Sequence, residues 1–214
     1  MQHEMPHFEM KTDLLFDATA TSNLAQMRSA TKDVHERLHE HPILSFLTTS
    51  HLTLPHYMRV LYSFERFYEN LHRAFRSRQL DIIGHKLNLI RQDLRSLALA
   101  PNPLPACEYI SATASKSRIM GIEYVILGSA LGATMIAKNI EKQLGLTQQH
   151  GNAFFGSGQQ TIQENWQHFL RVLESDCADI NDCCDSARHC FEGLEQWLWD
   201  VSRQPDMEFD DAKP

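Results

Sequence analysis

The feature that most constrains the fold of this chain is the spacing of its apolar residues, which recur three and four positions apart in one segment after another. This spacing predicts amphipathic helices over residues 22–38, 55–78, 81–97, 117–144, 160–175 and 177–201, and a weaker helix over 107–113. No convincing run alternates polar and apolar residues as a strand does, and 9 Gly and 8 Pro are few for a turn-rich all-β fold. We therefore predict one all-α domain, a bundle of about seven to eight helices.

The composition of the chain narrows its class and its partners. Residues 1–19 read as a flexible lead-in, 20–202 as the folded domain and 203–214 as an acidic tail. The formal net charge of −7 argues against a nucleic-acid partner. The start of the chain lacks the apolar core of a signal peptide, so we expect a cytoplasmic protein. The apolar stretch 119–137 could span a membrane by length, but its small residues favour a buried core helix, and we expect no membrane anchor.

The cysteines are five in number, and four of them lie close together near the C-terminal end. No Cys-x-x-Cys pair occurs, which argues against a zinc ribbon. We expect reduced thiols in a cytosolic helical segment. The five are Cys107, Cys177, Cys183, Cys184 and Cys190.

One of the 12 histidines stands apart on the first predicted helix, for which Ser22 is a suitable N-cap. At 100° per residue, His35 lies at the edge of the apolar face, about 60° from its centre. Arg28 lies about 20° further round and two turns earlier. A neutral imidazole is a good iron or zinc ligand, and the guanidinium could pair with an anionic group of the same ligand. The alternative is a half-buried histidine with local hydrogen bonds.

The same helix carries a short zinc-protease pattern. The run from His35 to His39 reads His-Glu-x-x-His. That family needs a third ligand downstream, and we find no clear candidate for it. The metalloprotease interpretation is therefore weak.

The apolar helix 117–144 contains two glycines one turn apart, Gly128 and Gly132. Each costs about 1 kcal/mol relative to alanine in a helix interior, so some other interaction should offset it. One explanation is close packing of two helices. The other is a flat ligand lying against the bare backbone. Ser129 adds a hydroxyl between them that could order a water.

Taken together, two segments of the chain resemble haem oxygenase. Residues 27–38, MRSATKDVHERL, are similar to the proximal helix, where an Ala-Thr-x-x-x-His segment supplies the haem-iron ligand. Residues 121–133, GIEYVILGSALGA, are similar to the distal helix of the bacterial branch. Phe154, Phe155, Trp166 and Phe169 match later helices of the family, and the resemblance spans about residues 24–198.

The resemblance implies that haem, both substrate and cofactor, lies between these helices with His35 on its iron. Gly128 and Gly132 would leave room for bound O₂, and Ser129 would touch a proton-delivering water network. Arg28 would pair with a haem propionate. Further candidates for haem contacts are Thr31, Tyr124 and Lys138.

The implied reaction opens haem to biliverdin, CO and Fe²⁺ with electrons from an external reductase or ferredoxin. We expect a redox partner protein and a monomer or weak dimer. A local basic patch would steer that partner to the site, and four side chains are candidates for it: Arg28, Lys32, Lys138 and Lys142.

Two positions depart from the family pattern. Animal-type members carry an acidic residue where this chain has Ser129, whereas bacterial members also show serine there. The position one turn after the proximal histidine is often acidic in the family, and here it is His39. This second departure leaves open how the proximal imidazole is hydrogen-bonded.

Three other functions compete with this one. A haem-free di-iron oxygenase of the same fold resembles Glu-x-x-His plus Asp-x-x-x-His, which this chain has at Glu69/His72 and Asp185/His189, with Glu36 and Glu123 as extra carboxylates. A haem carrier would bind through His35 without turnover. A thiamine-degrading enzyme of this fold would use a catalytic cysteine, and the clustering of the cysteines in the last helix disfavours it.

Overall fold

The computed structural model describes residues 22–75, 81–113 and 115–204, and in this part of the chain it contains helices and no strand. The all-α prediction is confirmed. The predicted lead-in 1–19, the end of the second helix near Arg78 and the tail beyond 204 lie outside the described residues. The elements are α1 (Asn23–Glu40), the 3₁₀ helix η1 (Ser45–Thr48), α2 (Leu54–Phe75), α3 (Asp81–Ser96), α4 (Lys116–Leu144), α5 (Ala153–Gly156), α6 (Gln159–Asp176) and α7 (Ile180–Ser202).

Side-chain caps and a glycine set the helix boundaries, and two of these boundaries agree with the prediction. The Ser22 hydroxyl accepts a hydrogen bond from the backbone N–H of Ala25 and so caps α1 as predicted. Gly145 ends α4 with φ of 69°, a left-handed conformation that glycine adopts without strain. The last helix begins later than predicted, because the Asp179 carboxylate caps it by accepting from the N–H groups of Asn181 and Asp182. Cys177 instead forms the C-cap of α6.

The predicted helix over residues 107–113 is wrong. The segment is extended, because side chains of α2 bind its backbone groups. The Asn70 amide donates to the Ile110 carbonyl at 3.0 Å and accepts from the Ile110 N–H at 2.8 Å. Arg73 donates to the Cys107 carbonyl at 3.0 Å. These bonds satisfy backbone groups that a helix would otherwise pair internally.

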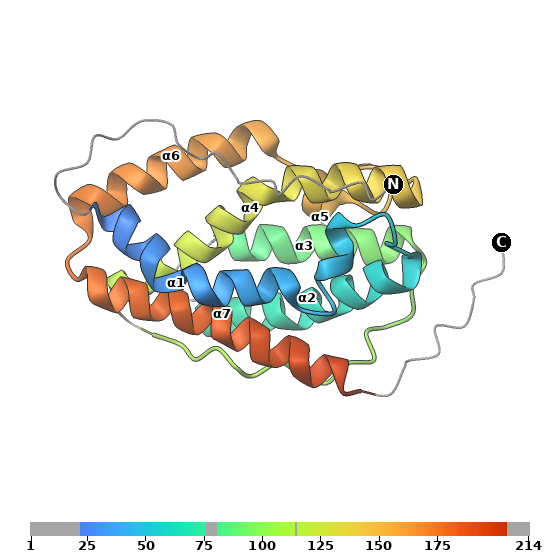
Figure 1. Ribbon diagram of the computed structural model, residues 1–214, viewed down its shortest axis with the longest axis horizontal. Helices are drawn as coiled ribbons and strands as arrows, with labels where there is room; N and C mark the ends of the chain where they lie inside the picture. Colours follow the sequence, from blue (N-terminus) through green and yellow to red (C-terminus); the bar gives the residue numbers. More distant parts are fainter. Residues whose placement is uncertain (1–21, 76–80, 114, 205–214) are drawn as a thin grey trace, which may run out of the picture.

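The helices form a bundle in which α1, α4 and α7 lie on the side nearer the viewer and α2 and α3 lie behind them (Figure 1). α4 is the one described helix long and apolar enough to cross a membrane by length and composition alone. It is packed into the core as the sequence predicted, and its buried residues include Met120, Ile122, Val125, Ile126 and Ile140.

Candidate functional site

His35 lies on α1 half-buried, and no hydrogen bond involves its ring among the residues that the structure describes. Its ring meets the ring of His39 edge-on, with the centroids 4.5 Å apart, and that of Phe191 on α7 at 5.6 Å. Burial lowers the pKa of His35, the charge of His39 lowers it further, and Glu36 opposes both. The imidazole is therefore neutral at pH 7, which is the form that binds a metal.

α1 and α4 meet one turn before His35. Thr31 and Tyr124 are both buried and contact each other. Burial raises the pKa of Tyr124, whereas the Thr31 hydroxyl and the charge of Arg28 oppose that rise. The structure thus brings together three of the predicted site residues, with the Arg28 guanidinium exposed beside the contact.

From this contact α1 and α4 run in the same general direction and move apart, α4 rising away from α1 in Figure 1. His35 is one turn beyond Thr31, and Gly128 is one turn beyond Tyr124. Each of these two residues therefore lies one turn further along its own helix than the Thr31–Tyr124 contact.

The glycine pair does not mark a tight helix crossing. A Cβ atom at Gly132 would meet no atom within 4 Å, and one at Gly128 would lie 3.8 Å from the Trp166 ring of α6. The close approach occurs at Gly121, where a Cβ would lie 2.3 Å from the Cys183 carbonyl oxygen of α7. The explanation by close helix packing therefore belongs to Gly121, and Gly132 borders open space.

Two apolar residues that sequence reasoning missed extend the glycine face. Leu131 is 38% exposed and Met135 is 50% exposed, although both are large apolar side chains of a kind that is usually buried. With Gly128 and Gly132 they form the i, i+3, i+4, i+7 series of one helix face. This spacing is visible in the sequence, but in a helix as apolar as α4 the same spacing is also expected of a buried face. We call these four residues the glycine face.

An aromatic cluster flanks this face. The rings of Tyr124 and Trp166 lie 5.9 Å apart, and Trp166 stacks on Phe169 at 5.6 Å. These rings connect α4 to α6 and so set the position of α6 beside Gly128.

The two remaining predicted residues lie on α4. Ser129 is exposed, and its hydroxyl donates to the Ile126 carbonyl of its own helix at 3.0 Å. Lys138 is exposed, about 15 Å along the helix axis from Gly128.

The di-iron ligand sets are not assembled. Glu69 pairs with Arg66 at 2.9 Å and also with Arg91, so guanidinium groups occupy its carboxylate. Asp185 and His189 are exposed on α7. Within the described ranges no three His, Cys, Asp or Glu side chains are placed to hold a metal ion.

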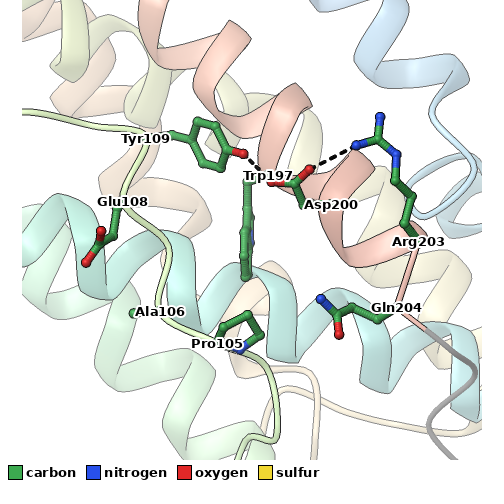
Figure 2. Close-up of a pocket in the computed structure, with 8 residues that line it drawn as sticks. All are labelled: Pro105, Ala106, Glu108, Tyr109, Trp197, Asp200, Arg203 and Gln204. Atoms are coloured by element: carbon green, nitrogen blue, oxygen red, sulfur yellow. Dashed lines mark hydrogen bonds and ion pairs between the residues drawn. The ribbon is translucent and has the colours of Figure 1, made fainter.

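A separate pocket of about 480 Å³ lies between the extended segment and the C-terminal end of α7. Figure 2 shows Tyr109 and Pro105 facing α7, with Asp200 joining the Tyr109 hydroxyl to Arg203. The Trp197 indole forms part of its lining and donates to the Ser63 carbonyl at 2.8 Å. None of the predicted site residues lines this pocket.

Comparison with solved structures shows which proteins share the fold. The protein from Neisseria meningitidis, a haem oxygenase with NO and CO bound, is 17% identical with a TM-score of 0.68 over 85% of this chain and 92% of its own. Haem oxygenase from Leptospira interrogans is 15% identical, with a TM-score of 0.66 over 84% of this chain and 99% of its own. Haem oxygenase-2 from Synechocystis, in complex with haem and NO, is 18% identical, with a TM-score of 0.64 over 85% of both chains.

No curated protein matches the sequence. The family model described as haem oxygenase matches residues 21–200, which include α1, α4 and the glycine face. This match covers well over half of the chain and agrees with the fold of the three solved structures. The chain therefore belongs to the haem oxygenase family of haem-degrading enzymes.

Proposed function

We propose that this chain binds haem between α1 and α4 and opens it oxidatively to biliverdin, CO and Fe²⁺. One observation carries the proposal: a half-buried, neutral imidazole on α1 lies one turn beyond the Thr31–Tyr124 contact with α4, and an exposed apolar face with two glycines begins one turn beyond the same contact. A flat apolar ring system with a central iron is the kind of ligand that such an arrangement accommodates. Haem, when bound, supplies the iron that takes up O₂ and the ring that is oxidised.

Each site residue has a role that its surroundings support. His35 binds the iron, since its lowered pKa keeps the ring unprotonated. Gly132 leaves space beside the backbone for bound O₂, and Leu131 and Met135 contact the apolar ring. Arg28, exposed beside the helix contact, pairs with a propionate.

Three further residues keep narrower roles in the proposal. Tyr124 and Thr31 hold the two helices together at the closed end of the site. Ser129 orders water near the glycine face, and Lys138 is a second partner for a propionate. Their positions around the site support these roles.

The reaction needs electrons from an external donor, a reductase or ferredoxin, and we propose that the chain works in the cytoplasm as a monomer or weak dimer. Lys32, Lys138 and Lys142 are exposed, as is Arg28. Such side chains could attract an acidic donor despite the net charge of −7.

Haemin titration tests the iron ligand. The wild-type chain is expected to bind haemin near 1:1 with a Soret band of histidine ligation, and His35→Ala to weaken binding greatly. His39→Ala is the matched control, because His39 lies one turn away, touches His35 and is exposed. A Soret shift that survives in His35→Ala would refute the ligand assignment.

Turnover distinguishes the enzyme from a carrier. Haemin-loaded protein supplied with a reductase, its reductant and O₂ is expected to lose its Soret band and yield a bilin. Stable haem under these conditions would leave binding intact and contradict the oxygenase proposal. Two tightly bound irons in protein purified without haem would contradict it in favour of the di-iron alternative.

A further inference from the structure

Two imidazoles lie side by side near the C-terminal end of α1. His35 and His39 are one helical turn apart, and their ring centroids lie 4.5 Å apart with the ring planes at 82°. Among the residues that the structure describes, no hydrogen bond reaches either ring, so the ring nitrogens are free to bind a ligand. The pair also forms the ends of the His-Glu-x-x-His pattern, and haem binding through His35 makes no use of His39.

The distance between the two rings suits a shared metal ion. Two nitrogens that bind one zinc ion at the usual bond length lie about 3.3 Å apart. His39 is exposed, and rotation of its ring about its side-chain bonds is sufficient to bring a nitrogen to this distance from His35. The His35 ring is half-buried and packs against the Phe191 ring at 5.6 Å, so it provides the fixed half of the site. Two water molecules would complete a tetrahedral zinc site.

The charges around the two imidazoles favour a cation. His39 lies in the last turn of α1, at the negative end of the helix dipole. The two cationic side chains of α1 that are nearest in sequence are both offset by carboxylates. Lys32 lies 3.9 Å from Glu36, and Arg37 lies 2.8 Å from Glu195 of α7.

We propose that the haem-free protein binds one divalent transition-metal ion such as Zn²⁺ through His35 and His39, and that this ion and haem exclude each other. Imidazole nitrogens suit Zn²⁺, and each ring supplies one of them. A zinc protease needs a third protein ligand, and no group of three His, Cys, Asp or Glu is placed to hold an ion in the described part of the chain, so we assign binding and not hydrolysis. The exclusion rests on the proposed function, because it follows only if haem iron also binds His35.

Zinc titration of the full chain without haem tests the site. Thermal unfolding should move to higher temperature as Zn²⁺ is added, because the ion binds the folded chain. His39→Ala and His35→Ala should each weaken zinc binding at least about tenfold in calorimetry, since even an outer partner of a metal ligand is worth that much. His39 is exposed, so its replacement should leave the fold intact.

Two controls separate this pair from the other histidines. His189→Ala removes an exposed histidine of α7 and should leave zinc binding unchanged. His3 and His7 are also four positions apart, outside the described residues. The double variant His3→Ala/His7→Ala should still bind one zinc ion, and the further change His39→Ala should weaken it as in the wild type. Imidazole NMR signals of His35 and His39 should shift together as zinc is added, which locates the ion directly.

Haemin titration in the presence of zinc tests the exclusion. At a free Zn²⁺ concentration ten times its Kd, haemin should bind the wild type about tenfold more weakly than without zinc. Haemin should bind His39→Ala with the same affinity in both conditions, because that variant holds no zinc beside His35. Haemin that binds through His35 equally well with and without bound zinc would overturn the exclusion.

Failure of the zinc site differs from failure of the proposed function. Zinc binding that is absent, or that is the same in the wild type and in His39→Ala, would overturn the site whatever haemin does. A chain that binds zinc through both imidazoles and binds no haemin would support the site. The same result would contradict the proposed function, and the exclusion with it.

Discussion

At the level of single residues, three glycines of α4 look alike in the sequence and differ in their surroundings. Gly121 meets the backbone of α7, Gly128 lies beside an indole ring, and Gly132 borders open space. The sequence predicted that Gly128 and Gly132 needed an explanation. It could not separate a glycine packed against another helix from one that borders open space, because that depends on which helix lies opposite.

Alanine at these positions should separate folding from function. Gly121→Ala is expected to cost about 1–3 kcal/mol of stability, since its Cβ would lie 2.3 Å from a backbone oxygen. Gly132→Ala should raise stability by about 1 kcal/mol, because the helix gains a better former without a clash. Urea unfolding measures both, and haem turnover of Gly132→Ala should fall. A stabilised Gly132→Ala with unchanged turnover would remove this residue from the proposed site.

Lys86 offers a pH test of a buried charge. Its ammonium group lies 3.4 Å from the Phe154 carbonyl oxygen and 5.1 Å from the centroid of that ring. Burial lowers its pKa from 10.5 to about 8, a difference that corresponds to a cost on the order of 3 kcal/mol at neutral pH. Because the unfolded chain holds the proton longer, this cost is fully present below pH 8 and is relieved as the pH rises towards 10.5.

Lys86→Met should therefore be more stable than the wild type at pH 7, and its advantage should shrink between pH 8 and pH 10. Denaturant unfolding of both proteins across this range measures the difference. Lys116→Met, an exposed lysine on α4, is the control and should show no such trend. An advantage that stays constant with pH would show that the packing of Met, and not the charge, accounts for the effect.

At the level of elements, helices with strong apolar periodicity could be predicted from the sequence, and the connection before α4 could not. The spacing that suggested a helix over 107–113 is short, and the backbone there finds its partners on α2. Arg66 extends this pattern by donating to the Leu104 and Asn102 carbonyls. Such partners are distant in sequence, so local pattern cannot reveal them.

Asn70 should be the most sensitive residue of this connection. It is 3% exposed and makes both hydrogen bonds to the Ile110 backbone. Asn70→Ala would leave a buried N–H and a carbonyl without partners, at an expected cost of about 2–4 kcal/mol. Urea unfolding checks this value, with the half-buried Asn139→Ala as the control for losing an amide that bonds two backbone carbonyls. An Asn70→Ala cost no larger than that of the control would contradict the role of Ile110.

At the level of the whole molecule, the sequence predicts the two segments of the candidate site but not how they pack against each other. His35 and the glycine pair lie about ninety residues apart in the chain. The Thr31–Tyr124 contact joins α1 to α4 one turn before His35 and Gly128, and α6 and α7 pack around both helices. Helix periodicity fixes which residues share a face, whereas the register between two helices is decided by packing.

Since haem would contact both α1 and α4, it should stabilise the whole fold against unfolding. At a free haemin concentration one hundred times Kd, the gain is about 2.7 kcal/mol. The gain needs a neutral His35, whose pKa is held below the ordinary 6.5 by burial. It should therefore persist as the pH falls through 6.5 and disappear only at lower pH, where the proton competes with iron.

Thermal unfolding with and without haemin between pH 8 and pH 5 measures this window. His35→Ala should show little haemin-dependent shift at any pH, whereas His39→Ala should retain the shift. His39→Ala also removes a neighbouring positive charge that lowers the pKa of His35. In this variant the stabilisation by haemin should therefore be lost at a higher pH than in the wild type. A wild-type shift that vanishes above pH 6.5 would contradict the lowered pKa of His35, and a haemin-dependent shift that survives in His35→Ala would contradict the ligand assignment.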